Sequence, residues 1–157
     1  MLKLDGDKLE IPLPAFLSAE KVGDIVLAGA QAAVSKIKTR TRDGIGVDDK
    51  PMKTKSKTPN RWGTYSDSTS QRREKEGRNV DIRDLTRTGR MIQGVIVENV
   101  QVTENGATAF VTVANSEKEK AAYQQAMTPW FGLSPLDVEL VESVITEELR
   151  KAVDSED

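Results

Sequence analysis

A long polar segment from Lys38 to Arg90 separates the two parts of this chain that have the patterning of a folded core. The segment holds fifteen of the chain's 23 Lys and Arg residues and few large apolar side chains. Connections longer than about 15 residues are usually functional or disordered, because they contribute little to a compact core. We therefore expect this segment to contact something outside its own fold.

The composition fits one domain and argues against several chemistries. A chain of 157 residues can bury a core without covalent staples, so we expect a single domain, 1–157, with a long basic loop at 41–80 inside it. Cysteine and histidine are absent, which removes disulfides, thiolate ligands and the commonest general base. We expect no metal, no cofactor and no enzymatic activity.

Charge is unevenly distributed along the chain. The net charge is −2 overall, but residues 38–90 carry +7 and residues 91–157 carry −8. A positive middle and a negative end favour contacts between copies, or attraction to an acidic partner.

No apolar run approaches the roughly 20 residues needed to cross a bilayer, so we expect no membrane association. The first residues also lack the apolar core of a signal peptide. These features predict a protein that stays in the cytoplasm where it is made.

Two long amphipathic helices flank the polar segment. Ser18 is a candidate cap for the first, whose apolar side chains recur every three or four residues from Val22 to Ile37. Ser134 followed by proline begins the second, whose stripe runs from Leu136 to Ala152. Between them, residues 70–77 and 81–93 are expected to be helical, and residues 117–127 to be either a helix or a polar loop.

A β-hairpin is predicted from Val95 to Val113, with Asn105-Gly106 as its turn. Its second strand alternates, and Ala107, Ala109, Val111 and Val113 should face the helices. The predicted fold class is α+β. It has a small antiparallel sheet with a central hairpin packed against the long N-terminal and C-terminal helices, plus a long extended basic loop.

Gly44 and Gly46 suggest a phosphate-binding loop, but they follow a helix rather than a strand, and the lysine-hydroxyl ending is missing. Asp43, Asp48 and Asp49 also lack the ligand spacing and closing glutamate of a calcium loop. We interpret this stretch as an ordinary turn.

Nucleic-acid binding remains the alternative function. Many cations of the 38–90 segment could neutralise phosphates, and Trp62 and Tyr65 could stack on bases. Interspersed acids, an acidic final third and a sequence pI near 5.4 oppose this interpretation. We therefore weigh a protein-facing loop above a nucleic-acid site.

Several motifs, taken in order, resemble a phage structural family. They are Lys36 to Met52, the Thr64-Tyr-Ser-Asp-Ser-Thr loop, Leu85-Thr-Arg-Thr-Gly-Arg-Met, and Pro129-Trp-Phe-Gly-Leu-Ser-Pro-Leu-Asp before the last helix. This arrangement is similar to the tail-completion, or virion-morphogenesis, proteins that join head and tail in tailed bacteriophages. The resemblance covers roughly residues 37–153.

The resemblance implies a structural protein of the virion neck, made in the host cytoplasm, that forms a ring, with six copies expected. Its implied partners are the connector or other neck proteins and the tail-tube or tail-terminator proteins. DNA may pass through such a ring, but specific binding is not expected. Our candidate interface residues are Arg40, Arg42, Lys53, Lys55, Trp62, Tyr65, Arg72, Arg73, Arg90, Trp130 and Phe131.

Overall fold

The computed structural model describes residues 3–5, 8–11, 17–52, 65–86, 88–103 and 106–155. The fold is α+β, as expected. Its elements in chain order are β1 (Lys3–Asp5), β2 (Lys8–Ile11), α1 (Ala19–Arg42), α2 (Asp67–Lys75), α3 (Arg90–Gln93), β3 (Val95–Thr103), β4 (Gly106–Val113), the 3-10 turn η1 (Asn115–Glu117), α4 (Lys118–Met127) and α5 (Pro135–Asp154).

The sheet is antiparallel, with strand order β1-β2-β4-β3. The predicted hairpin is confirmed as β3 and β4, while its turn residues 104–105 lie outside the described residues. In β4 the four side chains expected to face the helices are all buried, and the side chains between them are half-buried. A register shift between Val97 and Asn99 introduces an irregularity in β3.

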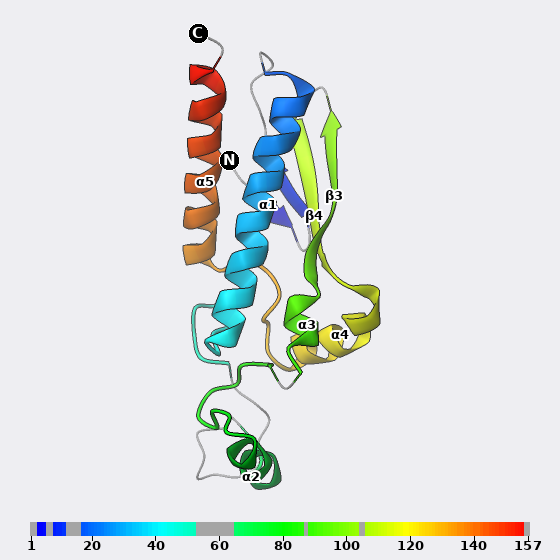
Figure 1. Ribbon diagram of the computed structural model, residues 1–157, viewed down its shortest axis with the longest axis vertical. Helices are drawn as coiled ribbons and strands as arrows, with labels where there is room; N and C mark the ends of the chain where they lie inside the picture. The colour runs from blue at the N-terminus through cyan, green and yellow to red at the C-terminus, as the bar shows by residue number, and fades with distance from the viewer. Residues whose placement is uncertain are drawn as a thin grey trace.

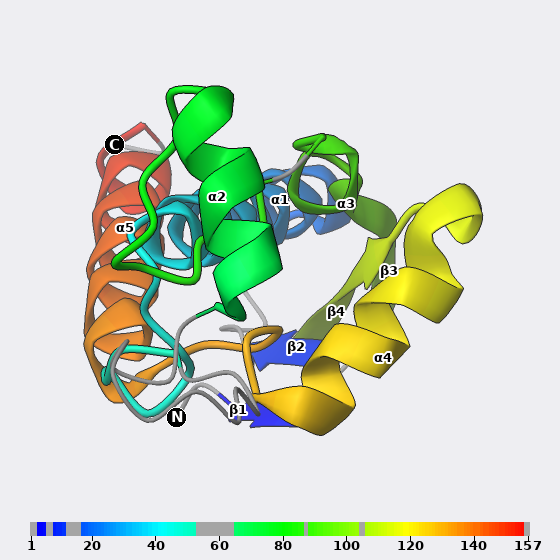
Figure 2. The same cartoon turned by 90° about the horizontal axis from the view of Figure 1, so that it is seen from below.

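The elements form layers, with α1 lying between the sheet and α5 (Figures 1 and 2). The face of α1 that is buried contains the small residues Gly29, Ala30 and Ala33. Because these side chains are short, neighbouring elements can approach the α1 backbone closely. The core is aliphatic apart from Trp130, which is fully buried.

Both capping predictions are confirmed. The Ser18 side chain accepts a hydrogen bond from the Lys21 backbone N–H, and Ser134 and Asp137 form a reciprocal capping box at the start of α5. The predicted core stripe of α5 was too wide, however. Val141 and Ile145 are buried, but Leu136 is 64% exposed and Leu140 38%, since only one side of the helix faces α1.

Cations from α1 fix both ends of α5. The Lys21 ammonium donates to the Ala152 carbonyl (3.4 Å) and the Ser155 hydroxyl (3.0 Å) at the C-terminal end, where positive charge is favourable. At the other end, Arg40 forms a buried ion pair with Asp137. The two helices are therefore held in antiparallel register at both ends.

The helix predicted over 81–93 was wrong except for its last turn, α3. The Asp84 carboxylate instead accepts a hydrogen bond from the Thr86 backbone N–H (3.1 Å), and Leu85 takes a left-handed conformation with φ of 51°. Side-chain bonds of this kind compete with helical backbone bonds. The helix expected at 70–77 is present as α2, which begins and ends earlier, at Asp67–Lys75. Of the two alternatives for residues 117–127, the structure has the helix, α4.

The turn after α1 packs tightly against two other segments. Gly44 has φ of 76°, and a β-carbon there would lie 3.0 Å from the Ile82 β-carbon. A β-carbon on Gly46 would lie 2.9 Å from the Pro129 carbonyl oxygen. These glycines therefore allow the turn to pack closely against residues 82–83 and Pro129. Close packing of this kind explains the two glycines without a phosphate-binding loop.

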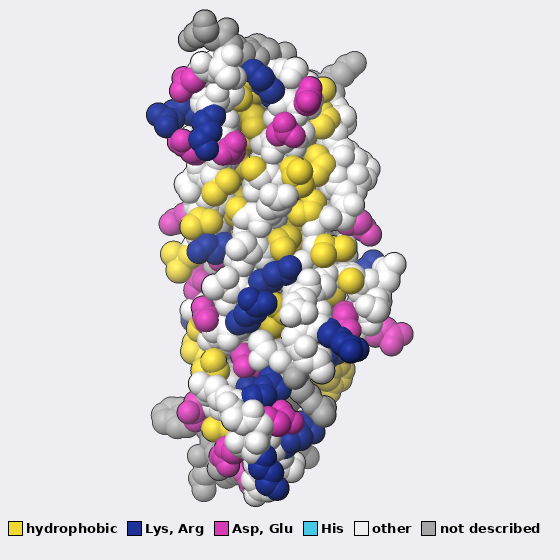
Figure 3. Space-filling view, viewed as in Figure 1, with side chains coloured by type: hydrophobic (Ala, Val, Ile, Leu, Met, Phe, Trp, Pro, Cys, Tyr) yellow, Lys and Arg dark blue, Asp and Glu magenta, His cyan; other side chains and the backbone are white. Residues whose placement is uncertain are grey.

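Figure 3 shows hydrophobic side chains on the face formed by α1 and β3. Leu27 of α1 and Val102 of β3 are among the exposed hydrophobic side chains of the described residues. Within the described ranges, each helix is too short or too polar to cross a membrane.

Candidate functional site

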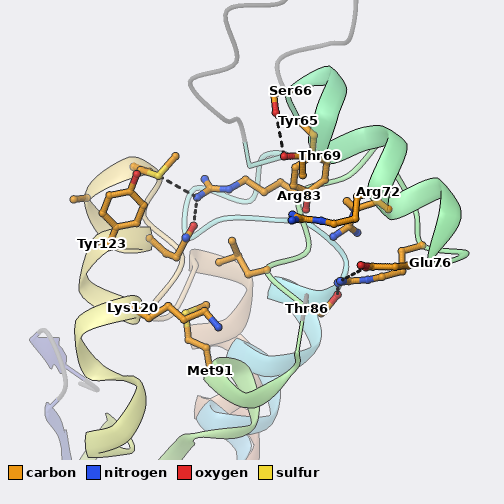
Figure 4. Close-up of a pocket in the computed structure, with 16 residues that line it drawn as sticks. Tyr65, Ser66, Thr69, Arg72, Glu76, Arg83, Thr86, Met91, Lys120 and Tyr123 are labelled. Atoms are coloured by element: carbon orange, nitrogen blue, oxygen red, sulfur yellow. Dashed lines mark hydrogen bonds and ion pairs between the residues drawn. The ribbon is translucent and has the colours of Figure 1, made fainter.

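A cleft of about 780 Å³ opens between α2, the segment from Glu76 to Met91, and α4 (Figure 4). This is within the usual size range of ligand pockets. Its lining includes five cations and one carboxylate, together with hydroxyl and apolar side chains. The charged lining residues are Arg72, Arg73, Arg78, Arg83, Lys120 and Glu76.

One wall of the cleft is an ion-pair network centred on Asp84. The buried Arg73 guanidinium donates to the Asp84 carboxylate (3.0 Å) and to the Asn79 carbonyl (2.6 Å). Arg78 lies 3.9 Å from the same carboxylate and donates to the Thr86 hydroxyl (2.9 Å). The Tyr65 ring lies 4.4 Å from the Arg73 guanidinium carbon, a cation–π contact. These contacts hold α2 against the stretch that follows it.

Arg83 crosses the cleft to α4. Its guanidinium donates to the Thr128 hydroxyl (2.6 Å) and to the Gln124 side-chain oxygen, and Figure 4 shows the side chain extending between the two walls. Only 2% of Arg83 is exposed. Burial lowers the pKa of this guanidinium, although an arginine stays charged at neutral pH.

Two further pKa shifts follow from the same packing. Burial by itself would raise the pKa of Asp84, but hydrogen bonds from Thr86 and Arg73 outweigh it, so the pKa of this carboxyl is lowered. Burial raises the pKa of the Tyr65 phenol. Asp84 is therefore a stable anion at neutral pH, and Tyr65 stays neutral.

The cleft suits a ligand that is both acidic and apolar. Arg72 is exposed at its edge and forms no ion pair or hydrogen bond with the described residues. Leu85 and Met127 supply apolar surface, and Tyr123, which is 65% exposed, extends it. Within the described residues, no group of three or more acidic side chains is placed to hold a metal ion.

The predicted interface residues fall into four groups. Arg40, Arg73 and Trp130 are buried and used inside the chain, so they are not exposed contacts. Arg42, Arg72 and Arg90 are exposed, whereas Tyr65 and Phe131 are half-buried. The remaining three, Lys53, Lys55 and Trp62, lie outside the described residues.

Arg40 is the clearest case of a cation that was predicted to lie at an interface but contacts residues inside the chain. Besides pairing with Asp137, its guanidinium donates to the backbone carbonyls of Trp130 (2.8 Å) and Gly132 (2.9 Å). Burial lowers its pKa, and Asp137 offsets part of that effect. Arg40 therefore fastens the end of α1 to the loop before α5.

The structure also brings together residues that sequence reasoning did not single out as a site. Arg83, Lys120 and Gln124 meet at the cleft, with Asp84 buried behind its lining, although they come from two separate regions of the chain. No local motif links these positions. Asp84 followed two residues later by Thr86 was the one local sign, because this spacing favours a side-chain-to-backbone turn.

Comparisons with protein-family models, with curated proteins and with solved structures find no match to this chain. What the cleft binds must therefore be argued from its own side chains.

Proposed function

We propose that this chain is a non-enzymatic structural protein of the neck of a tailed phage, where it completes the tail and joins it to the head. It acts by forming a homo-oligomeric ring, with six copies expected, and by adaptor contacts to the proteins above and below that ring. The proposal of this family rests on the resemblance of the sequence motifs. The distribution of charge in the structure supports assembly of several copies.

The observation that carries the proposal is that one molecule has two surfaces of opposite charge on different sides. The cleft between α2 and α4 has cations along its lining. The outer side of α5 carries the exposed carboxylates of Glu139, Glu142 and Glu147. Figures 1 and 2 place α5 along one side of the molecule, and α2 and α4, whose residues line the cleft, toward one end. Such surfaces favour head-to-tail contact between copies, which forms a ring when the rotation between neighbouring copies closes.

The exposed cations Arg42 and Arg90 are the remaining candidates for adaptor contacts. Both lie outside the cleft lining. They are free to meet acidic surfaces of a connector or a tail protein while the cleft is occupied.

The test is deletion of the coding sequence from the phage or prophage that carries it, followed by electron microscopy of the particles. We expect filled heads and separate tails, and infectivity restored when the chain is supplied from a plasmid. Complete, infectious particles formed without the chain would contradict the proposal.

The cleft also keeps the nucleic-acid alternative open to a direct test, since Arg72 stands exposed at its edge. A DNA-binding role predicts affinity that falls steeply with added salt and that drops in Arg72→Glu. Absence of binding to single- or double-stranded DNA at 50 mM salt would remove this alternative.

A further inference from the structure

We infer that the cleft between α2 and α4 receives the outer face of α5 from a second copy of the chain. The inference rests on the proposed function for its expectation of a second copy. It adds which two surfaces meet and which residues decide the contact.

The donor surface is a stripe on α5 formed by Leu136, Glu139, Leu140, Ser143 and Glu147, which we call the outer stripe. Its members are spaced three or four residues apart, so they share one face of the helix, and all are exposed. Leu136 and Leu140 leave 64% and 38% of their surface exposed. Two exposed leucines one turn apart are typical of the apolar anchors of a helix that binds in a groove. Beside them, Glu139 supplies a carboxylate that is unpaired among the described residues, whereas Glu147 is paired with Arg150 (3.1 Å).

The receiving surface offers matching chemistry. Leu85, Met127 and Tyr123 give the cleft apolar side chains for the two leucines, and a methionine adapts well to such partners. Arg72 and Lys120, on opposite walls, give it cations for the carboxylates. Lys120 is 46% exposed and its nearest carboxylate, Glu117, lies 3.7 Å away, so it remains accessible to a second acid.

The positive charge is directed into the cleft rather than spread over this end of the molecule. Between residues 65 and 86 the chain has five basic and five acidic side chains. Four of the five bases line the cleft, but only one of the five acids does. Glu76 is that acid, and it lies 3.5 Å from Arg78. Arg73 and Arg78 are paired with Asp84 behind the lining, so the cations that an acidic partner can reach are Arg72 and Lys120.

Donor and receiver must belong to different copies. α5 lies on the far side of α1 from the sheet, whereas α2 and α4 lie toward the C-terminal end of α1 (Figures 1 and 2), and their residues line the cleft. α5 is fixed at both ends by Lys21 and Arg40, so it cannot swing into its own cleft. Each copy can donate one α5 while receiving another, which makes the contact heterologous.

The test is a charge swap measured by sedimentation of the full chain over a range of concentrations, at 50 mM and 500 mM salt. Arg72→Glu and Glu139→Lys should each raise the self-association Kd at least about tenfold, because each places like charges together. The double variant should return the Kd to within about threefold of wild type. Both residues are exposed and form no ion pair with the described residues, so each variant should fold.

Lys75→Glu is the matched control, since it makes the same charge change on α2 at an exposed position outside the cleft lining. Its Kd should change less than about threefold. Leu140→Ser should weaken association at both salt concentrations, because its contribution is apolar.

Wild-type chain that stays monomeric at all concentrations would overturn the inference. So would association unaffected by the two single reversals, or single defects that the double variant does not repair. Loss of DNA binding in Arg72→Glu with unchanged self-association would assign the cleft to nucleic acid instead. These outcomes are separable from the proposed function, because the deletion experiment reports on the virion whatever the copies do in solution.

Discussion

In the scaffold formed by α1, α5 and the sheet, most of the buried side chains are aliphatic, among them Val26, Val111 and Val141. Between residues 65 and 86, which we call the polar pole, the buried side chains are Ser70, Arg73, Arg83 and Asp84. One part is held by apolar burial, which depends little on pH or salt near neutrality. The other depends on ion pairs and hydrogen bonds. The two parts should therefore fail under different conditions.

The largest expected effect breaks the scaffold. Trp130 is fully buried, and its indole N–H donates to the Ala121 carbonyl (3.3 Å). We expect Trp130→Ala to lower the free energy of unfolding by about 4 kcal/mol, because it leaves a large cavity. Denaturant unfolding followed by circular dichroism measures this loss.

Tyr123→Ala is the control for this prediction, since Tyr123 is a nearby aromatic residue that is mostly exposed. Its cost should stay within about 0.5 kcal/mol. Equal losses in the two variants would mean that Trp130 does not belong to the core.

A smaller and more local effect breaks the polar pole. Asp84→Asn removes the carboxylate that pairs with Arg73 and leaves that guanidinium buried without its charge partner. We expect the local free energy of opening to fall by about 3 kcal/mol at pH 7. Hydrogen exchange should accelerate across residues 65–86 while the scaffold amides keep their protection.

The pH dependence has a definite sign. The pKa of Asp84 is lowered in the folded chain, so its stabilisation is complete above its ordinary pKa near 4 and is lost as the pH falls through the folded value. The wild-type pole should therefore open below about pH 4, and Asp84→Asn should lose that dependence. Glu76→Gln, at an exposed ion pair, is the control and should change little. Equal acceleration of hydrogen exchange in the scaffold and in the polar pole would contradict the proposed difference between these two parts.

The smallest effect tests the turn after α1 at Gly44, which we call the joint between the two parts. Gly44 and Gly77 both have positive φ, but only Gly44 is crowded, by Ile82. Gly77→Ala should cost about 1 kcal/mol from backbone strain alone, and Gly44→Ala about 2 kcal/mol. Unfolding free energies of the two variants give the difference, and equal values would show that the joint has room to adjust.

The same contrast explains how far sequence reasoning reached. The stripe of α1, the caps at Ser18 and Ser134, and the alternation of β4 are local patterns, and all three were predictable. The pole was not, because Arg73, Arg83 and Asp84 gain their roles from partners brought together by folding. Arg40 and Arg73, which were predicted to contact a partner, are buried inside the chain. The pairing of β2 with β4 is likewise non-local, because it places Leu9 opposite Ala109, far away in the sequence.

α1 also has a mechanical consequence. A helix of 24 residues is about 36 Å long, and α1 runs along the long axis of the molecule from the capped Ser18 to the joint beside the polar pole (Figure 1). It is pinned to α5 near both of its ends, so bending it would require one of those attachments to break. A force applied at the pole therefore reaches the opposite end as a displacement of the whole rod. We therefore expect the molecule to act as a rigid connector between the partners that bind its two ends.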